Sequence, residues 1–415
     1  MEMNSSEKRK ILFIGLELGV NSAVVSYYIS GMEEVVTIPS IRGEGNYTIP
    51  TAICTTMRGN TYCGEEAVNR RFHDNVKYYD HLLEGALNGD QIKKENLIAY
   101  LDWFLDFRFS LLKENMEWRL AVTIPAVSKK AVKVLNTIRT YFSLTNDQFR
   151  ISEYSESFFD YTHHKGNAIW ISESVIFELT ENRLLMRAFK IGTPQSPRSV
   201  VSIGKSWEVS EDLLQDNEKK DQNFSAILQK VLECRKISNI FLIGDGFHPK
   251  WMKKTLETVG EERKVFIGKN LYSKGACMGL YQASLARIST YIFECHYKVI
   301  SRLCIRLKKD REEQLFPLTN PNGCWFIGGY QYTLLFDGTP ELDIYSISST
   351  GETKLVQTLK MADFPDKRKK SIRLKLKAYC IDEATLSIDI EDDGFGNFYE
   401  STEKQWNFQI KMERE

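Results

Sequence analysis

The sequence has no excess of charge of either sign, because its 55 lysines and arginines balance its 55 aspartates and glutamates. A chain without net charge creates no general field toward nucleic acid or an anionic membrane, so neither is an expected partner. Long apolar runs are also missing: the first, from Ile11 to Leu16, stops at Glu17 and is too short for a signal peptide or a membrane span. We therefore expect a cytoplasmic protein without a membrane span.

Metal-site and enzyme signatures are equally scarce. The eight cysteines form no Cys-x-x-Cys pair, which argues against a zinc site or a disulfide framework. His163 and His164 lack a third ligand, and the acidic run from Glu391 to Asp393 lacks the ligand spacing of a calcium loop. The sequence also contains no Walker loop, no Gly-x-Ser-x-Gly elbow, no His-Glu-x-x-His and no kinase signature. Any activity must be sought in more distributed patterns.

The length of 415 residues is enough for two or three domains, and the first part of the chain alternates between strand and helix patterns. Apolar residues at intervals of three and four predict helices over about residues 91–115 and 129–141. A β-hairpin near residues 10–30 precedes them, and a buried strand near residues 118–124 separates them. Strand, crossover helix and strand is the order of an α/β sheet. A β-rich meander and two further strand–helix turns after about residue 168 indicate a second sheet lobe.

The remainder of the chain has a different pattern. Apolar and polar residues alternate over residues 372–378 and 386–390, which predicts an antiparallel β-domain with one solvated face. We place the boundary at residues 300/301, with the first lobe at about 10–165 and the second at about 166–290. An aromatic cluster in the β-domain is a candidate peptide groove, although such residues usually pack as cross-strand partners; it comprises Trp325, Phe326, Tyr330 and Tyr332.

Six segments of the first 300 residues resemble, in order, motifs of the heat-shock chaperone and actin-like ATPase superfamily. The hairpin Ile14-Gly-Leu-Glu-Leu-Gly-Val-Asn-Ser22 is similar to its first phosphate loop, I-G-I-D-L-G-T-T-x-S. The others are residues 50–67, 122–125, 151–153, 241–246 and 274–279. The resemblance implies a two-lobed actin-like, ribonuclease-H-like ATPase fold, followed by a β-sandwich-like domain.

The resemblance also implies a site for ATP or ADP with Mg²⁺. Glu17 and Glu153 match the acidic residues on the magnesium side, and Glu153 is the candidate catalytic residue. The remaining nucleotide-contacting candidates lie in two turns: Gly19, Val20, Asn21 and Ser22 at the phosphates, and Gly244, Asp245 and Gly246 at the adenosine. Without the resemblance, these glycines are turn residues, and Glu153 is an acidic residue favoured at a helix start by the helix dipole.

The sequence departs from the family pattern at several phosphate-handling positions. Glu17 stands for an aspartate, and Val20 and Asn21 stand for two threonines. The glycine-rich second loop, D-x-G-G-G-T, is matched by Ile171-Ser-Glu-Ser-Val-Ile-Phe177. Glu173 would then repel a phosphate about 4 Å away by roughly 4 kcal/mol at an effective dielectric constant of about 20.

The family's catalytic lysine has no clear equivalent, because the ungapped match places His81 there and a shifted register places Lys77. We therefore predict a degenerate site in a chaperone-like protein of bacterial type, a binding or assembly module with weak or no ATP hydrolysis. Its β-domain would hold a protein partner.

Two alternatives stay open. One is an active ATPase in which Asn21, Ser22 and Glu153 handle phosphate and magnesium while Lys77 or His81 replaces the usual lysine. The other is a filament-forming cytoskeletal relative.

Overall fold

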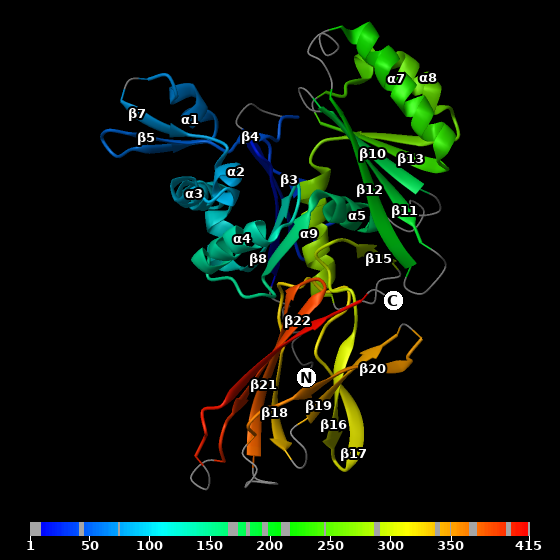
Figure 1. Ribbon diagram of the computed structural model, residues 1–415. Helices are drawn as coiled ribbons and strands as arrows, with labels where there is room; N and C mark the ends of the chain where they lie inside the picture. Colours follow the sequence, from blue (N-terminus) through cyan, green and yellow to red (C-terminus); the bar gives the residue numbers. More distant parts are fainter. Residues whose placement is uncertain are drawn as a thin grey trace, which may run out of the picture. The chain divides into compact units, whose positions relative to one another are not determined.

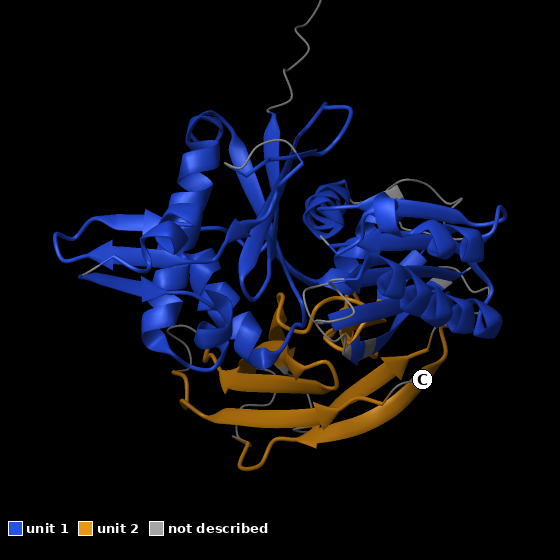
Figure 2. Cartoon of the chain, turned by 90° about the horizontal axis from the view of Figure 1, so that it is seen from above, with its two compact units in different colours: residues 1–293 blue, residues 294–415 orange. Residues whose placement is uncertain are grey.

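The protein is described by a computed structural model, which is mixed α/β and forms two compact units, residues 1–293 and 294–415 (Figures 1 and 2). The residues that the structure describes are 10–40, 45–73, 75–164, 173–179, 183–192, 198–208, 216–244, 246–285, 291–336, 341–348, 350–364, 372–395 and 400–413. No helix formed by these residues is long and apolar enough to cross a membrane.

The first sheet of unit 1 combines antiparallel and parallel strands. Its order is β3-β2-β1-β8-β9, and β4 pairs with β2 outside this path. The strands β1, β2 and β3 are antiparallel neighbours, whereas β8 and β9 run parallel to β1. The bounds are β1 Ile11–Leu18, β2 Ser22–Ile29, β3 Val36–Thr37, β4 Ile49–Pro50, β8 Glu117–Ile124 and β9 Phe149–Glu153.

The second sheet of unit 1 repeats this arrangement. Its order β12-β11-β10-β13-β14 matches β3-β2-β1-β8-β9 strand for strand, with the same pattern of antiparallel and parallel pairs. One further strand, β15, lies beside β12. The bounds are β10 Glu173–Leu179, β11 Arg183–Ile191, β12 Arg198–Glu208, β13 Ile237–Ile243, β14 Lys264–Gly268 and β15 Tyr291–Glu294. Unit 1 therefore contains one sheet topology twice.

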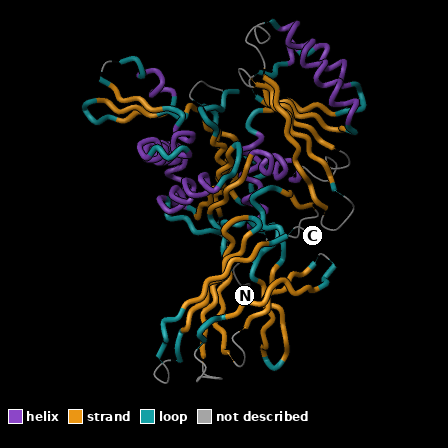
Figure 3. Tube along the Cα trace, viewed as in Figure 1, coloured by secondary structure: helices purple, strands orange, loops and turns teal. Residues whose placement is uncertain are grey.

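Crossover helices join the parallel strands (Figure 3). Three of these helices are preceded by an aspartate or a serine, namely Asp90, Ser128 and Asp216. The side chain of each accepts a hydrogen bond from backbone N–H groups in the first turn, which have no partner within the helix. The helices predicted at 91–115 and 129–141 are both present. The bounds are α3 Gln91–Asn115, α4 Lys129–Tyr141, α7 Asn217–Cys234, the 3₁₀ turn η2 Pro249–Trp251 and α8 Lys253–Val259.

The last helix of each half packs on the sheet of the other half. Helix α9, Leu271–Ser284, follows β14 but lies on β1, where a Cβ at Gly15 would come within 2.1 Å of the Ser273 carbonyl oxygen. Helix α5, Tyr154–His164, follows β9 but places Phe158 against Phe189 of β11 and Phe241 of β13, with ring centroids 4.7 and 4.8 Å apart. This exchange ties the two halves together.

A small insertion separates β4 from α3. It contains the three-stranded sheet β6-β5-β7 and two short helices. The bounds are β5 Ile53–Thr56, β6 Thr61–Cys63, α1 Glu65–Arg70, β7 Val76–Tyr79 and α2 Leu82–Leu87.

Unit 2 consists of two four-stranded antiparallel sheets, β17-β16-β19-β20 and β18-β21-β22-β23. Residues from both sheets form one core, and the alternation predicted over 372–378 and 386–390 places Leu374, Leu376, Ile388 and Ile390 inside it. The bounds are β16 Leu303–Lys309, β17 Glu312–Pro317, β18 Tyr330–Phe336, β19 Glu341–Ile347, β20 Thr353–Lys360, β21 Ile372–Asp382, β22 Thr385–Asp392 and β23 Gln405–Lys411.

Candidate functional site

The turn between β1 and β2 is held by hydrogen bonds from both sides. The Gly19 N–H donates to the Ser22 carbonyl oxygen at 2.8 Å, and the Thr51 N–H donates to the Asn21 carbonyl oxygen at 2.9 Å. The Thr51 hydroxyl donates to the Val20 carbonyl oxygen at 3.3 Å. A Cβ at Gly19 would lie 3.2 Å from the hydroxyl of Tyr154. The predicted hairpin turn is therefore present, with Tyr154 against Gly19.

Glu17, the residue before the end of β1, is half-buried next to this turn, and its Oε2 atom is shielded from solvent. Burial raises its pKa to about 8, the nearby Glu178 carboxylate adds to the rise, and a hydrogen bond from the Ser273 backbone N–H opposes it. Glu17 Oε2 accepts no hydrogen bond from any group that the structure describes. Because a buried carboxylate without a cation is costly, Glu17 keeps its proton at neutral pH.

Glu178 occupies the same place in the second sheet, one residue before the end of β10. Unlike Glu17, it has a cation: Arg187 Nη1 donates to Glu178 Oε2 at 3.2 Å, and the Tyr272 hydroxyl donates to the same oxygen at 3.1 Å. Arg187 also donates to the Tyr272 hydroxyl at 2.9 Å. The strand registers place Ser26 in the first sheet where Arg187 stands in the second. The two carboxyl groups are therefore equivalent in position and different in charge balance.

Two stacked tyrosines accompany these carboxyl groups. Tyr154, the first residue of α5, and Tyr272, near the start of α9, have ring centroids 4.3 Å apart and planes within 15°. Burial, together with Glu17 and Glu178, raises the pKa of the Tyr154 phenol well above its ordinary value. The tyrosines lie at the starts of the two exchanged helices, so the stack joins both halves of unit 1.

Glu153 ends β9 directly before Tyr154 and is half-buried. Burial lowers the pKa of Arg187, but Tyr272, Glu178 and Glu153 raise it, and the net result is above the ordinary value. Glu153 therefore belongs electrostatically to the same cluster, which we call the Glu17–Glu178 cluster: Glu17, Glu153, Tyr154, Glu178, Arg187 and Tyr272.

The predicted adenosine turn lies beside the same end of the second sheet. Gly244 has φ +92°, and a Cβ there would come within 2.6 Å of the Leu179 carbonyl oxygen. A Cβ at Gly246 would come within 2.5 Å of the Leu179 side chain. Asp245 lies outside the described residues. The close contact with Leu179 is enough to explain why both positions are glycine. The two glycines therefore do not by themselves indicate a ligand.

The structure places Glu173 away from the Glu17–Glu178 cluster. Glu173, expected to face phosphate, begins β10 and pairs with Arg235 at 2.9 Å, at the opposite end of the strand from Glu178. Residues 180–182, between β10 and β11, lie outside the described residues. A sequence signal for Glu178 existed, because Leu16-Glu17-Leu18 and Phe177-Glu178-Leu179 each end a strand.

Neither lysine substitute joins the cluster. His81 adopts φ +49° before α2, with Nδ1 3.0 Å from a carboxylate oxygen of Asp80, and Lys77 is exposed on β7. Within the described part of the chain, no interaction links Lys77 or His81 to Glu17 or Glu178.

The geometry thus defines an α/β unit with duplicated sheets and a buried acidic cluster, followed by a separate β unit. Comparison with known families gives a match over residues 34–296 to the C-terminal part of a family of unknown function (DUF5716), and over residues 298–412 to a domain of unknown function (DUF8552). Because the first match covers more than half of the chain, the chain belongs to the DUF5716 family. No curated protein matches it.

Proposed function

We propose that unit 1 is a divergent actin-like or chaperone-like nucleotide-binding fold that has lost the ATPase cycle, and that the protein serves as a binding or assembly module. Two observations support the fold: the sheet topology occurs twice, and the last helices are exchanged between the halves. A two-lobed fold of this kind would place its ligand where the equivalent strand ends meet, which is where the Glu17–Glu178 cluster lies.

The Tyr154–Tyr272 stack carries the proposal that the site is degenerate. Phosphate sites depend on open backbone N–H groups at turns and helix starts, whereas this cluster is filled by two buried phenol rings. Separating stacked aromatic rings costs about 0.5–1.5 kcal/mol beyond their burial, and the Tyr272–Glu178 hydrogen bond would be lost as well. Nucleotide binding would have to offset these losses.

A specific observation favours an altered but active ATPase as the second candidate. Glu17 and Glu178 come from different sheets yet lie close enough for Glu178 to raise the pKa of Glu17. The described residues contain no group of three histidine, cysteine, aspartate or glutamate side chains that could hold a metal ion, so a cation here would also need ligands from the nucleotide. A divalent cation between Glu17 and Glu178 would displace the proton of Glu17, because a bound cation stabilises the ionised carboxylate. In this alternative the tyrosines would move aside when magnesium and nucleotide bind.

Calorimetric titration with ATP and ADP, with and without Mg²⁺, and a phosphate-release assay separate the two candidates. The proposal predicts no binding heat and no shift of melting temperature at millimolar nucleotide. Magnesium-dependent turnover that Glu153→Ala abolishes would overturn it. Glu257→Ala, at an exposed position of α8, is the matched control. Gly244→Val is unsuitable because its side chain would collide with the backbone of Leu179.

The binding surface of the module is proposed to lie in unit 2, where a protein partner remains a prediction. The four aromatic residues expected to form a peptide groove are half-buried. Trp325, Tyr330 and Tyr332 pack against the core of unit 2, and Phe326 contacts Trp325 and Tyr297. They therefore stabilise the unit, and recognition must use its solvated faces.

A further inference from the structure

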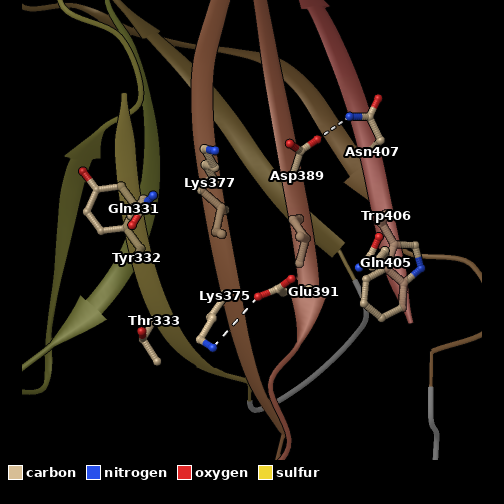
Figure 4. Close-up of a pocket in the computed structure, with 12 residues that line it drawn as sticks. Gln331, Tyr332, Thr333, Lys375, Lys377, Asp389, Glu391, Gln405, Trp406 and Asn407 are labelled. Carbon is tan, nitrogen blue, oxygen red and sulfur yellow. Dashed lines mark hydrogen bonds and ion pairs between the residues drawn. The ribbon is translucent and has the colours of Figure 1, made fainter. Parts of the chain in front are cut away.

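The outer face of the sheet β18-β21-β22-β23 carries a cavity of about 670 Å³ (Figure 4). This volume falls within the range of about 300–1,000 Å³ that is usual for ligand sites. Leu376 and Ile390 lie beneath it with their side chains in the core, while the neighbouring residues of each strand point outward. The cavity is therefore lined mainly by polar side chains on a rigid sheet.

The polar residues form two rows that cross all four strands. Strand pairing places Gln331 beside Lys377, Lys377 beside Asp389, and Asp389 beside Asn407. The second row, two residues along each strand, contains Thr333, Lys375, Glu391 and Gln405. Neighbouring strands are about 4.8 Å apart, so a ligand lying along a row would meet a new polar group at each step.

The rows arrange donors and acceptors in a fixed order. Lysines on β21 only donate, carboxylates on β22 only accept, and the outer strands carry amides and a hydroxyl that do both. Local contacts hold the groups in place: the Asn407 amide donates to Asp389, and Lys375 pairs with Glu391 at 4.0 Å and with Asp393. Groups that are already held lose little conformational freedom when a ligand binds.

This chemistry excludes most ligand classes. Two lysines face two carboxylates in the rows, so the face has no excess of positive charge for a phosphate backbone. Its outward side chains are charged, amide or hydroxyl groups rather than the apolar side chains that a lipid requires, and lysine and glutamate are depleted at the centres of protein interfaces. A sugar suits it, because each sugar hydroxyl both donates and accepts and can therefore pair with the lysines, the carboxylates and the amides of the rows alike.

We propose that this face binds a neutral oligosaccharide along the two rows, which we call the polar rows. The inference rests on the proposed function only in taking unit 2 as the binding part of the protein. Nucleotide turnover would contradict the proposed function but would not affect this inference. Absence of sugar binding would contradict this inference but would not affect the proposed function.

The test is calorimetric titration of the full chain with three neutral probes: maltohexaose, cellohexaose and chitohexaose. At least one should bind saturably, and Lys377→Ala/Asp389→Ala should weaken that binding about tenfold or more, because it removes a donor and an acceptor from the centre of one row. Glu352→Ala/Lys354→Ala, at exposed positions in and next to β20, removes the same two charges and should leave binding unchanged. Asp389→Asn, nearly the same shape, provides a second variant if the double variant folds poorly.

Three results would overturn the inference. One is no saturable binding to any of the three sugars, and another is equal binding by wild type and Lys377→Ala/Asp389→Ala when both are folded. The third is a wild-type dimer in sedimentation that this substitution dissociates, which would show that a second copy of the chain covers the face.

Discussion

Glu17 and Glu178 occupy equivalent positions at the ends of β1 and β10, yet only Glu178 is paired with an arginine. The equivalent of Arg187 in the first sheet is Ser26, whose hydroxyl bonds to the hydroxyls of Thr37 and Ser273 instead. Arg187 therefore balances the charge of Glu178 alone, and the proton retained by Glu17 removes the repulsion between the two carboxyl groups. The two sheets therefore share a topology but differ in the charge balance at these equivalent carboxyl groups.

This asymmetry predicts a pH-dependent stability. The pKa of Glu17 is about 8 in the folded protein and 4.5 ordinarily, so between these values the folded state holds a proton that the unfolded state releases. The stabilisation is fully present below pH 4.5 and is lost as the pH rises through about 8, at up to about 1.4 kcal/mol per pH unit.

Glu17→Gln should flatten this dependence and make the variant more stable than wild type at alkaline pH. Urea unfolding across the pH range measures the effect. The exposed substitution Glu257→Gln is the control and should follow the wild-type curve. Wild-type and Glu17→Gln curves that stay parallel would show that Glu17 does not hold the proton.

Much of the fold follows from local patterns in the sequence. The helix Gln91–Asn115 was predictable because its apolar residues recur at helical spacing and Leu97, Leu101 and Phe104 lie buried on one face. Strands β21 and β22 were predictable because one face of their sheet is buried and the other is solvated. Apolar and polar residues therefore alternate along each strand.

The Glu17–Glu178 cluster was only partly predictable. Glu17 and Glu153 were named as candidates from the resemblance, whereas Glu178 was not, because the acidic residue that the resemblance singled out on this strand was Glu173, at its other end. Arg187 and Tyr272 are 85 residues apart in sequence and meet only through strand pairing and helix exchange. Periodicity shows which face of an element is buried, but it does not show which element covers that face.

The Tyr272 hydroxyl should contribute more to stability than the Tyr154 hydroxyl. Tyr272→Phe removes a group bonded to both Glu178 and Arg187, and a buried charged group that loses a partner costs about 1–3 kcal/mol. Tyr154→Phe keeps the same ring stack and leaves the Glu178–Arg187 pair intact, so it is the matched control. Chemical denaturation of both variants measures the difference, and equal losses would contradict the assigned network.

The contact between the exchanged helices should be intolerant of a single methyl group. A Cβ at Gly275 of α9 would lie 1.7 Å from the Ser157 carbonyl oxygen of α5, which is backbone and cannot turn aside. Gly275→Ala should therefore destabilise unit 1 by about 1–3 kcal/mol or more. Gly204→Ala on β12, where the nearest atom lies at 3.9 Å, should have little effect. Similar melting temperatures for the two variants would show that α5 and α9 are not in close contact.

Removing the Arg187 cation should be costly, and removing its carboxylate partner Glu178 as well should restore part of the loss. Arg187→Met leaves the partly buried Glu178 carboxylate without its counter-ion. Because the pair keeps some solvent contact, the loss should stay below about 3–5 kcal/mol, which is the cost of breaking a fully buried pair. In Arg187→Met/Glu178→Gln no charge remains to be balanced at that site, and the amide oxygen still accepts from the Tyr272 hydroxyl. A double-mutant cycle measured by urea unfolding should therefore give a coupling energy of about 0.5–3 kcal/mol. Additive losses would mean that Arg187 stabilises the cluster by packing alone, and the charge asymmetry between the two halves would then have no energetic role.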